Sequence, residues 1–351
     1  MNQEIRGADG LHYPFATEPG TGDGSAIAVA PGVWWLRMPL FTALPWINVW
    51  ALADGASWTI VDTGMNNPGA VAAWQAAAAT TLDGRPVSRV VATHMHPDHC
   101  GLAGWLTARY ATRLWMTRLE YLTGRLMAAD TGREPPPDGV NFYRAAGWDG
   151  DALRRYHDKF GSFGQMIYPM PASYRRIVDG ESLSIGGREW IVVVGTGHSP
   201  EHACLHCPEL RLLISGDQIL PRISSNVSVY PTEPDADPLL DWQQSIVAIK
   251  ARIPDDVLVL PAHNSPFHGL HARLDRLAAA HEEGLLRLER LLDQPRRAVD
   301  VFGSLFKRPI DAAVLGMATG EAIAHLNRLR VAGRVIRDCD ADGVWWWRRA
   351  P

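Results

Sequence analysis

The chain has 351 residues, of which 46% are hydrophobic and 21% are charged, so its composition predicts a folded protein with a sizeable core. Its formal net charge of −4 and isoelectric point of about 6.3 give it no overall attraction to nucleic acid or to an anionic membrane. No stretch offers the roughly 20 uninterrupted apolar residues of a membrane span, and four cysteines without a disulfide framework favour a reducing cytoplasm.

Strand and helix patterns alternate in the first third of the chain. Short apolar runs between turns predict strands, while an Ala-rich run and the stretch after residue 101 predict helices. The expected strands are 33–36, 48–52, 58–61, 89–93 and 113–116, and the expected helices are 69–80 and 102–110. The strand at 89–93 runs directly into a cluster of histidines.

The stretch 119–178 differs in character from what precedes it. Arg, Tyr and Gly recur throughout it, three consecutive prolines begin at Pro135, and a helix-like segment occupies 151–163. We interpret this stretch as a helical insertion that lies over the sheets.

Strand and helix patterns resume after the insertion and repeat the arrangement of the first half. The expected strands are 182–185, 189–195, 202–207, 211–215 and 257–260, and the expected helices are 238–252 and 270–292. This repetition predicts two βα halves packed face to face, which is an α/β protein of the αββα sandwich type.

The pattern changes again near the end of the chain. Three helix-type segments are followed by two apolar strands that join at an Asp342–Gly343 turn, and together these outline a winged helix. We therefore divide the chain into a main domain, 1–293, and a small winged-helix-like domain, 294–351. The three helix-type segments are 298–306, 310–317 and 320–332.

Four side chains of metal-ligating type, those of His94, His96, Asp98 and His99, follow the strand at 89–93. This is where the functional loops of α/β proteins lie. His94 and His96 are two residues apart on an extended backbone, so their rings point to the same side and can share one metal ion. Asp98 and His99 follow a proline that turns the chain, so they can face a second metal. Burying this set without a metal would be costly.

The His-x-His-x-Asp-His pattern after a buried strand resembles the metallo-β-lactamase superfamily, and further segments match that family's motifs in the family's order. The resemblance implies that His198 completes the ligand set of the first metal, that Asp217 bridges both metals and that His263 binds the second. It also implies that Asp62 orients the ligand rings. The matching segments are Ile60–Gly64, Gly195–Pro200, Ser215–Asp217 and Pro261–His263.

The ligand types predict the chemistry of such a site. Two divalent metal ions held by imidazole and carboxylate groups lower the pKa of a bound water toward about 7, so hydroxide is available at neutral pH. This hydroxide would attack a carbonyl or phosphoryl group, and Asp98 would orient it and pass a proton to the leaving group. Zinc is the default metal for these ligands, and iron or manganese also suits them. We interpret Cys100 as a small buried thiol rather than a nucleophile.

Two segments are candidates for contact with a substrate. Arg222, Ser225 and Asn226, in the loop that follows Asp217, could hold a carboxylate or a thioester head group, and an equally good interpretation is a loop tied by its own hydrogen bonds. The apolar segment 38–46 would favour an acyl chain or a ring over a sugar phosphate if it forms a wall of the cleft, and plain packing is the alternative.

The C-terminal stretch resembles a subgroup of the superfamily that appends a winged helix. From residue 294 on, ten Lys and Arg stand against six acidic residues, so this stretch carries +4 and the rest of the chain about −8. Such a charge permits nucleic-acid binding without favouring it. The domain could equally serve as a dimerisation surface, which would make the protein a homodimer, or as a lid on the active site.

The resemblance implies a metal-dependent hydrolase, and its glyoxalase II-like branch implies a small-molecule thioester or ester as substrate, of the hydroxyacylglutathione or acyl-CoA kind. A histidine at His96 argues against flavodiiron-type oxygen reductases, and an aspartate at Asp217 argues against lactamases with a cysteine ligand there. The alternatives are a single-strand-specific endoribonuclease that uses the winged helix, a lactonase or β-lactamase, and a metal-stabilised regulatory module. An intact ligand set argues against the last of these.

Overall fold

The first of two central sheets has seven strands, and they lie side by side in the order in which they occur in the chain. The computed structural model describes residues 5–7 and 9–351. From β3 to β6 neighbouring strands are antiparallel, and from β6 to β9 they are parallel. The strands are β3 (Ile27–Ala30), β4 (Val33–Pro39), β5 (Trp46–Asp54), β6 (Ser57–Val61), β7 (Val87–Val91), β8 (Arg113–Met116) and β9 (Arg175–Arg176).

The second sheet has five strands, again in chain order. Its first three pairs are antiparallel, whereas the last two strands are parallel. Both sheets therefore contain parallel neighbours whose carboxyl ends reach a common edge. The strands are β10 (Ser182–Ile185), β11 (Arg188–Gly195), β12 (His202–Cys207), β13 (Leu212–Gly216) and β14 (Leu258–Pro261).

Side chains alternate between the two faces of each strand, and this alternation divides the apolar core into layers. In β5, Trp50 and Leu52 point into the core between the sheets, while Val49 and Ala51 point to the outer face. The outer core of the first sheet is covered by α1 (Pro68–Ala79) and α3 (Ala103–Arg109), and that of the second sheet by α8 (Pro238–Arg252) and α9 (Leu270–Leu291). These four layers confirm the αββα sandwich predicted from the sequence.

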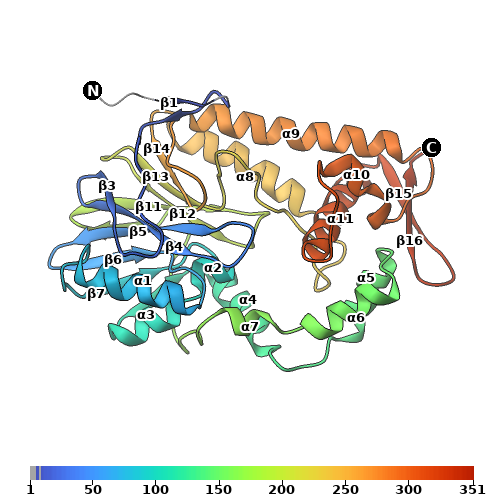
Figure 1. Cartoon of the computed structure of the whole chain (residues 1–351). Coiled ribbons are helices and arrows are strands. Elements are labelled where there is room, and N and C mark those ends of the chain that lie inside the picture. Colours follow the sequence, from blue (N-terminus) through green and yellow to red (C-terminus); the bar gives the residue numbers. More distant parts are fainter. Residues whose placement is uncertain (1–4, 8) are drawn as a thin grey trace.

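The insertion forms an arm that reaches from the sandwich to the C-terminal part of the chain (Figure 1). At one end Tyr121 packs in the core of the first sheet, and at the other Phe142 packs in the core that contains the C-terminal elements. Trp148 Nε1 also donates a hydrogen bond to Thr319 Oγ1 at 2.8 Å. The insertion thus extends beyond the sheets rather than only lying over them. Its helices are α4 (Arg118–Ala129), α5 (Pro137–Ala145), α6 (Gly150–Lys159) and α7 (Phe163–Met166).

The C-terminal part consists of two short helical turns, one long helix and a hairpin, and it shares its core with the second sheet. Leu285 and Leu288 of α9 pack in the same apolar cluster as Leu326 and Trp347, so α9 belongs to both the sandwich and the C-terminal part. The hairpin follows the long helix, as predicted. The elements are η1 (Ala298–Val301), α10 (Phe302–Leu305), α11 (Leu315–Val331), β15 (Val335–Cys339) and β16 (Trp345–Arg349).

Three expected helices have different bounds in the structure. The segment 151–163 is interrupted because Phe160 has an extended backbone, with φ −58° and ψ 141°, and a new helix begins at Phe163. The segments 310–317 and 320–332, expected as separate helices, are replaced by the single helix α11. Gly320 does not break this helix. It permits a close approach to a neighbouring loop, since a Cβ there would lie 2.8 Å from Ser228 Oγ.

A two-stranded ribbon, β1 (Ile5–Arg6) and β2 (His12–Tyr13), precedes the first sheet. Within residues 5–7 and 9–351, no helix combines the length and the apolar character that a membrane crossing requires. α2 (Pro97–Cys100), a single short turn, carries part of the histidine cluster.

Candidate metal centre

The seven side chains that the sequence marked as metal ligands come from four loops at one edge of the sandwich. The first loop follows β7 and leads into α2, the second joins β11 to β12, and the other two follow β13 and β14. Each of these loops begins where a strand ends, which is the usual position of ligand sites in α/β proteins. In chain order the seven are His94, His96, Asp98, His99, His198, Asp217 and His263.

Four of these side chains form a first group. One potential ligand atom each from His94, His96, His198 and Asp217 lies within 4.8 Å of the others. His94 Nε2 is 2.8 Å from His96 Nδ1 and 3.3 Å from His198 Nε2. Asp217 Oδ2 is 3.6 Å from His198 Nε2. Three imidazole nitrogens and a carboxylate oxygen therefore converge on one point, which is the donor set of a transition-metal site.

The remaining three side chains form a second group next to the first. Ligand atoms of Asp98, His99 and His263 also lie within 4.8 Å of one another, and His263 Nε2 is 3.3 Å from Asp98 Oδ2. Asp217 reaches this group as well, because its Oδ2 is 3.5 Å from His99 Nε2 and its Oδ1 is 3.5 Å from His263 Nε2. The carboxylate of Asp217 thus lies between the two groups.

Two unsatisfied atoms show that a cation would fit here. His99 Nε2 and Asp217 Oδ1 are buried and have no hydrogen-bond partner within the protein. Burying such atoms without a partner costs about 1–3 kcal/mol each. A divalent metal ion would satisfy both, so the residues present suit a metal site.

A buried carboxylate orients one of the rings. Asp62 has a left-handed backbone conformation, with φ 61°. Its Oδ1 accepts the backbone N–H of Thr93 at 2.8 Å, and its Oδ2 lies 2.7 Å from His99 Nδ1. A bond of this kind keeps the proton on Nδ1 and leaves Nε2 free to face a metal.

Two backbone carbonyls have the same effect on other rings. The carbonyl oxygen of Asn226 lies 2.7 Å from His198 Nδ1, and that of Trp46 lies 3.3 Å from His263 Nδ1. Trp46 ends the apolar segment 38–46, so this segment supports the site through its backbone. In both histidines Nε2 therefore faces the cluster.

Burial and neighbouring charges place His94, His96 and Asp217 in the protonation states that metal binding requires, whereas the carboxylates around them raise the pKa of His99 and of His263. Burial lowers the pKa of His94 well below its ordinary value and that of His96 to about 3. Burial alone would raise the pKa of Asp217, but the charges of His99 and His263 outweigh it and hold that pKa well below its usual range. Neutral imidazole and ionised carboxylate are the forms that bind metals.

Sequence reasoning missed His202, which starts β12. The backbone N–H of Asp217 donates to His202 Nε2 at 3.0 Å, and the His202 ring lies 4.7 Å from the ring of His94. Gly216 allows this approach, since a Cβ there would lie 2.5 Å from His202 Nε2. The only signal in the sequence is a histidine four residues after His198, at the start of an expected strand.

Asn48 and Glu120 were also missed, and both are fully buried. Asn48 Nδ2 donates to the carbonyls of Pro261 at 2.9 Å and Asn264 at 2.6 Å, which fixes the loop that carries His263. Glu120 accepts the backbone N–H groups of Met95 at 2.9 Å and Glu201 at 2.8 Å, one from each of two histidine-bearing loops. Burial raises the pKa of Glu120 to about 7.

The structure does not bring the three candidate substrate residues together. The Arg222 guanidinium lies over the ring of Tyr13, 5.1 Å from its centre. Ser225 Oγ donates to the carbonyl of Asp217, and Asn226 Nδ2 donates to Glu321 Oε2 at 2.8 Å. The Ser225 bond ties the loop to itself, whereas Arg222 and Asn226 contact β2 and α11.

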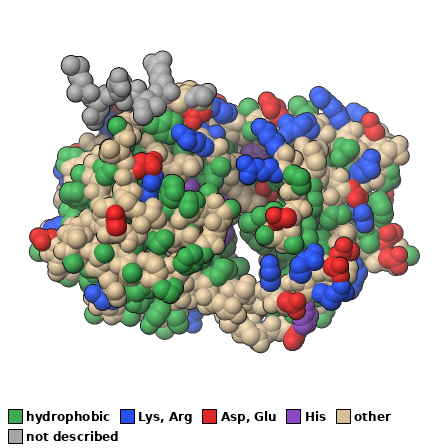
Figure 2. Space-filling view, in the orientation of Figure 1, with side chains coloured by type: hydrophobic (Ala, Val, Ile, Leu, Met, Phe, Trp, Pro, Cys, Tyr) green, Lys and Arg blue, Asp and Glu red, His purple; other side chains and the backbone are tan. Residues whose placement is uncertain are grey.

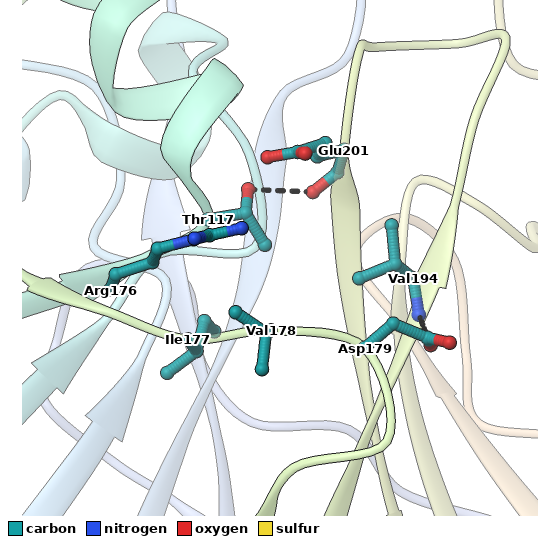
Figure 3. Close-up of a pocket in the computed structure, with 7 residues that line it drawn as sticks. All are labelled: Thr117, Arg176, Ile177, Val178, Asp179, Val194 and Glu201. Atoms are coloured by element: carbon teal, nitrogen blue, oxygen red, sulfur yellow. Dashed lines mark hydrogen bonds between the residues drawn. The ribbon is translucent and has the colours of Figure 1, made fainter.

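The surface is hollowed between the sandwich and the C-terminal part, and the insertion arm runs along the lower side of this hollow (Figure 2). A separate cavity of about 310 Å³ lies where Thr117 at the end of β8 faces the loop before β12 (Figure 3). Thr117 Oγ1 donates to the carbonyl of Glu201 at 2.7 Å across its rim. None of the seven clustered side chains lines this cavity, whose lining is Thr117, Arg176, Ile177, Val178, Asp179, Val194 and Glu201.

Two family descriptions match this chain. Residues 47–263 match the metallo-beta-lactamase superfamily, and residues 285–350 match a metallo-beta-lactamase-like, C-terminal domain. The first match contains all seven clustered side chains, and the second begins within α9.

Relatives match over nearly the full length. A Bacillus subtilis (strain 168) protein named "Probable metallo-hydrolase YqjP" is 24% identical over 89% of this chain and 96% of its own. A crystal structure of a beta-lactamase domain protein from Burkholderia ambifaria is 40% identical, covers 97% of this chain and 98% of its own, and has a TM-score of 0.89. A metallo-beta-lactamase family protein from Thermus thermophilus is 25% identical, covers 92% of this chain and 100% of its own, and has a TM-score of 0.76. With the αββα sandwich and the His/Asp cluster at its edge, these matches show that the chain belongs to the metallo-β-lactamase superfamily.

Proposed function

We propose that this protein is a metal-dependent hydrolase that cleaves a small-molecule thioester or ester. The observation that carries the proposal is the pair of ligand groups that meet at Asp217. Zinc suits this His/Asp set best, with one ion for each group. When bound, two such ions supply a nucleophilic hydroxide near neutral pH and polarise the carbonyl of the substrate.

Asp98 is the carboxylate in the cluster that is best placed to handle a proton. Its side chain is 21% exposed, whereas that of Asp217 is 12% exposed. Its Oδ2 lies 3.3 Å from His263 Nε2 and 3.9 Å from His99 Nε2. From this position Asp98 would orient the attacking water, accept a proton from it and deliver that proton to the departing thiolate or alkoxide.

Exposed apolar residues on the segments bonded to the ligand loops favour a substrate with an apolar acyl group. Met317 is 54% exposed, and its carbonyl accepts from Nδ2 of Asn226, the residue that supports His198; Tyr230, four residues after Asn226, is 44% exposed. Leu119 is 45% exposed, and its backbone N–H donates to Glu201 between His198 and His202. Exposed apolar groups beside a polar reaction centre are typical of sites for small organic ligands.

The C-terminal arginines give little support to the endoribonuclease alternative. A nucleic-acid surface needs cations that are free to contact phosphates. Most of the cations of this stretch instead pair with acidic side chains of the chain itself. The paired residues are Arg297, Arg328, Arg330, Arg334, Arg337, Arg348 and Arg349.

A substrate panel tests the proposal. The zinc-loaded protein would be assayed with a glutathione thioester, acyl-CoA thioesters, a lactone, a chromogenic cephalosporin and a short single-stranded RNA. The Asp217→Asn variant is the control for hydrolysis that does not depend on the site. We expect thioester or ester turnover that the variant loses. Turnover of the RNA alone would contradict the small-molecule assignment and favour the nuclease.

A further inference from the structure

The C-terminal helix α11 holds the segment that supports His198. We call residues 226–237, which lie between the loop after β13 and helix α8, the strap. Near its start, Asn226 Nδ2 donates to Glu321 Oε2 of α11 at 2.8 Å. Near its end, Asn327 Nδ2 of α11 donates to the carbonyl of Ala236 at 2.8 Å. Helix α11 thus binds the strap at both ends.

The strap in turn bonds to the metal centre through the backbone of Asn226. The carbonyl oxygen of Asn226 is 2.7 Å from His198 Nδ1. Asn226 therefore connects the two parts of the protein, with its backbone bonded to a ring of the cluster and its side chain bonded to the C-terminal helix. Its Oδ1 is also engaged, because it accepts from Ser228 Oγ at 2.5 Å. With these three bonds the residue has little freedom to move.

The packing next to this bond leaves no room for the strap to shift toward α11. The backbone N–H of Val229 donates to the carbonyl of Gly320 at 3.1 Å. Gly320 has no side chain, and a Cβ at this position would lie 2.8 Å from Ser228 Oγ and 2.9 Å from the carbonyl oxygen of Val229. The helix and the strap are thus in backbone contact directly beside Glu321, so the carboxylate of Glu321 meets Asn226 in a fixed position.

We propose that Glu321 is a positioning residue of the metal centre, which holds Asn226 so that the carbonyl of Asn226 fixes the ring of His198. The C-terminal domain thereby sets how tightly the first ligand group binds a metal ion. This inference rests on the proposed function, in which His198 is a metal ligand. It assigns the C-terminal domain a role at the reaction site that requires no nucleic acid.

Metal binding by two variants of Glu321 tests this role without a substrate. The affinity for Co²⁺ would be measured by competition with a chelator, and the visible absorption of bound Co²⁺ would report the geometry of its ligands. We expect Glu321→Ala to weaken Co²⁺ binding by about tenfold and to change the spectrum, as removal of a group behind a ligand commonly does. Glu321→Gln keeps an oxygen that can accept from Asn226, so we expect it to restore both properties.

The matched control is Glu283→Ala, which removes an exposed carboxylate of α9 whose ion pair with Arg287 is 3.9 Å long. Wild-type affinity and an unchanged spectrum in Glu321→Ala would overturn the inference. Equal losses in the Ala and Gln variants, with lowered thermal stability in both, would also overturn it, because the role would then be purely structural. Failure of the substrate panel would leave the Co²⁺ result intact and would refute only the proposed reaction. A wild-type protein that binds no Co²⁺ would refute both.

Discussion

At the scale of single residues, the proposed reaction depends most on Asp98. Its carboxylate belongs to the second ligand group and is the more exposed of the two carboxylates in the cluster. We expect Asp98→Ala to lower kcat by at least about 100-fold, because a proton donor and a ligand are lost together. The fold should remain, since the main-chain bonds of α2 do not involve this side chain.

This prediction is tested by measuring kcat together with the metal content and the thermal unfolding midpoint of the variant. Near-normal turnover with a normal metal content would refute the assigned role of Asp98. Loss of turnover together with a collapse of the unfolding midpoint would indicate a structural role instead.

The sequence was sufficient to identify the residues of the cluster, because their spacing follows strand ends and the pattern of a known family. It could not identify the residues that hold them. Asn48 bonds to Pro261, 213 residues away, and Glu120 bonds to Glu201, 81 residues away. A polar residue in a strand or helix gives no sign of its partner until the sheets are packed, so such contacts depend on the tertiary fold.

At the scale of secondary-structure elements, α11 shows how a local pattern can mislead. The sequence predicted two helices, 310–317 and 320–332, with a break between them. The structure has one helix, and the glycine allows its contact with Ser228. A glycine is needed here because of a loop about 90 residues earlier in the chain. No local sequence pattern reveals a contact of this kind.

Two glycines of α11 offer a matched test of this contact. A Cβ at Gly320 would lie 2.8 Å from Ser228 Oγ, whereas a Cβ at Gly316 would meet nothing within 4 Å. We expect Gly320→Ala to lower the free energy of unfolding by about 1–3 kcal/mol through overpacking. Gly316→Ala should raise it by about 0.5–1 kcal/mol through helix propensity. Urea denaturation measures both, and equal effects of the two substitutions would contradict the close contact.

Two buried histidines lie between α9 and α11, with ring centres 5.6 Å apart. Burial, aided by the charge of His325, lowers the pKa of His281 to about 4. An unfolded chain binds a proton at this histidine below about pH 6.5, whereas the folded chain does not until about pH 4. Stability contributed by the neutral ring is therefore present above about pH 6.5 and is lost as the pH falls.

Between about pH 6.5 and about pH 5 this linkage should cost about 2 kcal/mol of unfolding free energy. The His281→Gln variant cannot titrate at this site, so its stability should fall less over the same interval. The same substitution at the exposed His157 is the control. Parallel stability curves for the wild-type protein and His281→Gln would show that this ring does not titrate as described.

At the scale of the whole molecule, the layered architecture was predictable from strand and helix periodicity, while the connection between its parts was not. The sequence suggested a boundary at residue 293, but one apolar cluster contains residues of the second sheet, α8, α9, the insertion and the C-terminal part. Apolar periodicity shows which face of an element is buried and not which element covers it. Because these parts share one core, α11 lies close enough to form hydrogen bonds with the strap, which in turn bonds to His198.

We expect the seven clustered side chains to hold two metal ions, and elemental analysis of the whole protein measures this number. The protein would be purified without chelators, reconstituted with Zn²⁺, dialysed and measured by elemental analysis, with Asp217→Asn as the control. About two zinc ions per chain are expected, and fewer in the variant because Asp217 contacts both groups. A wild-type protein that retains no metal after reconstitution would show that the cluster is not a metal site.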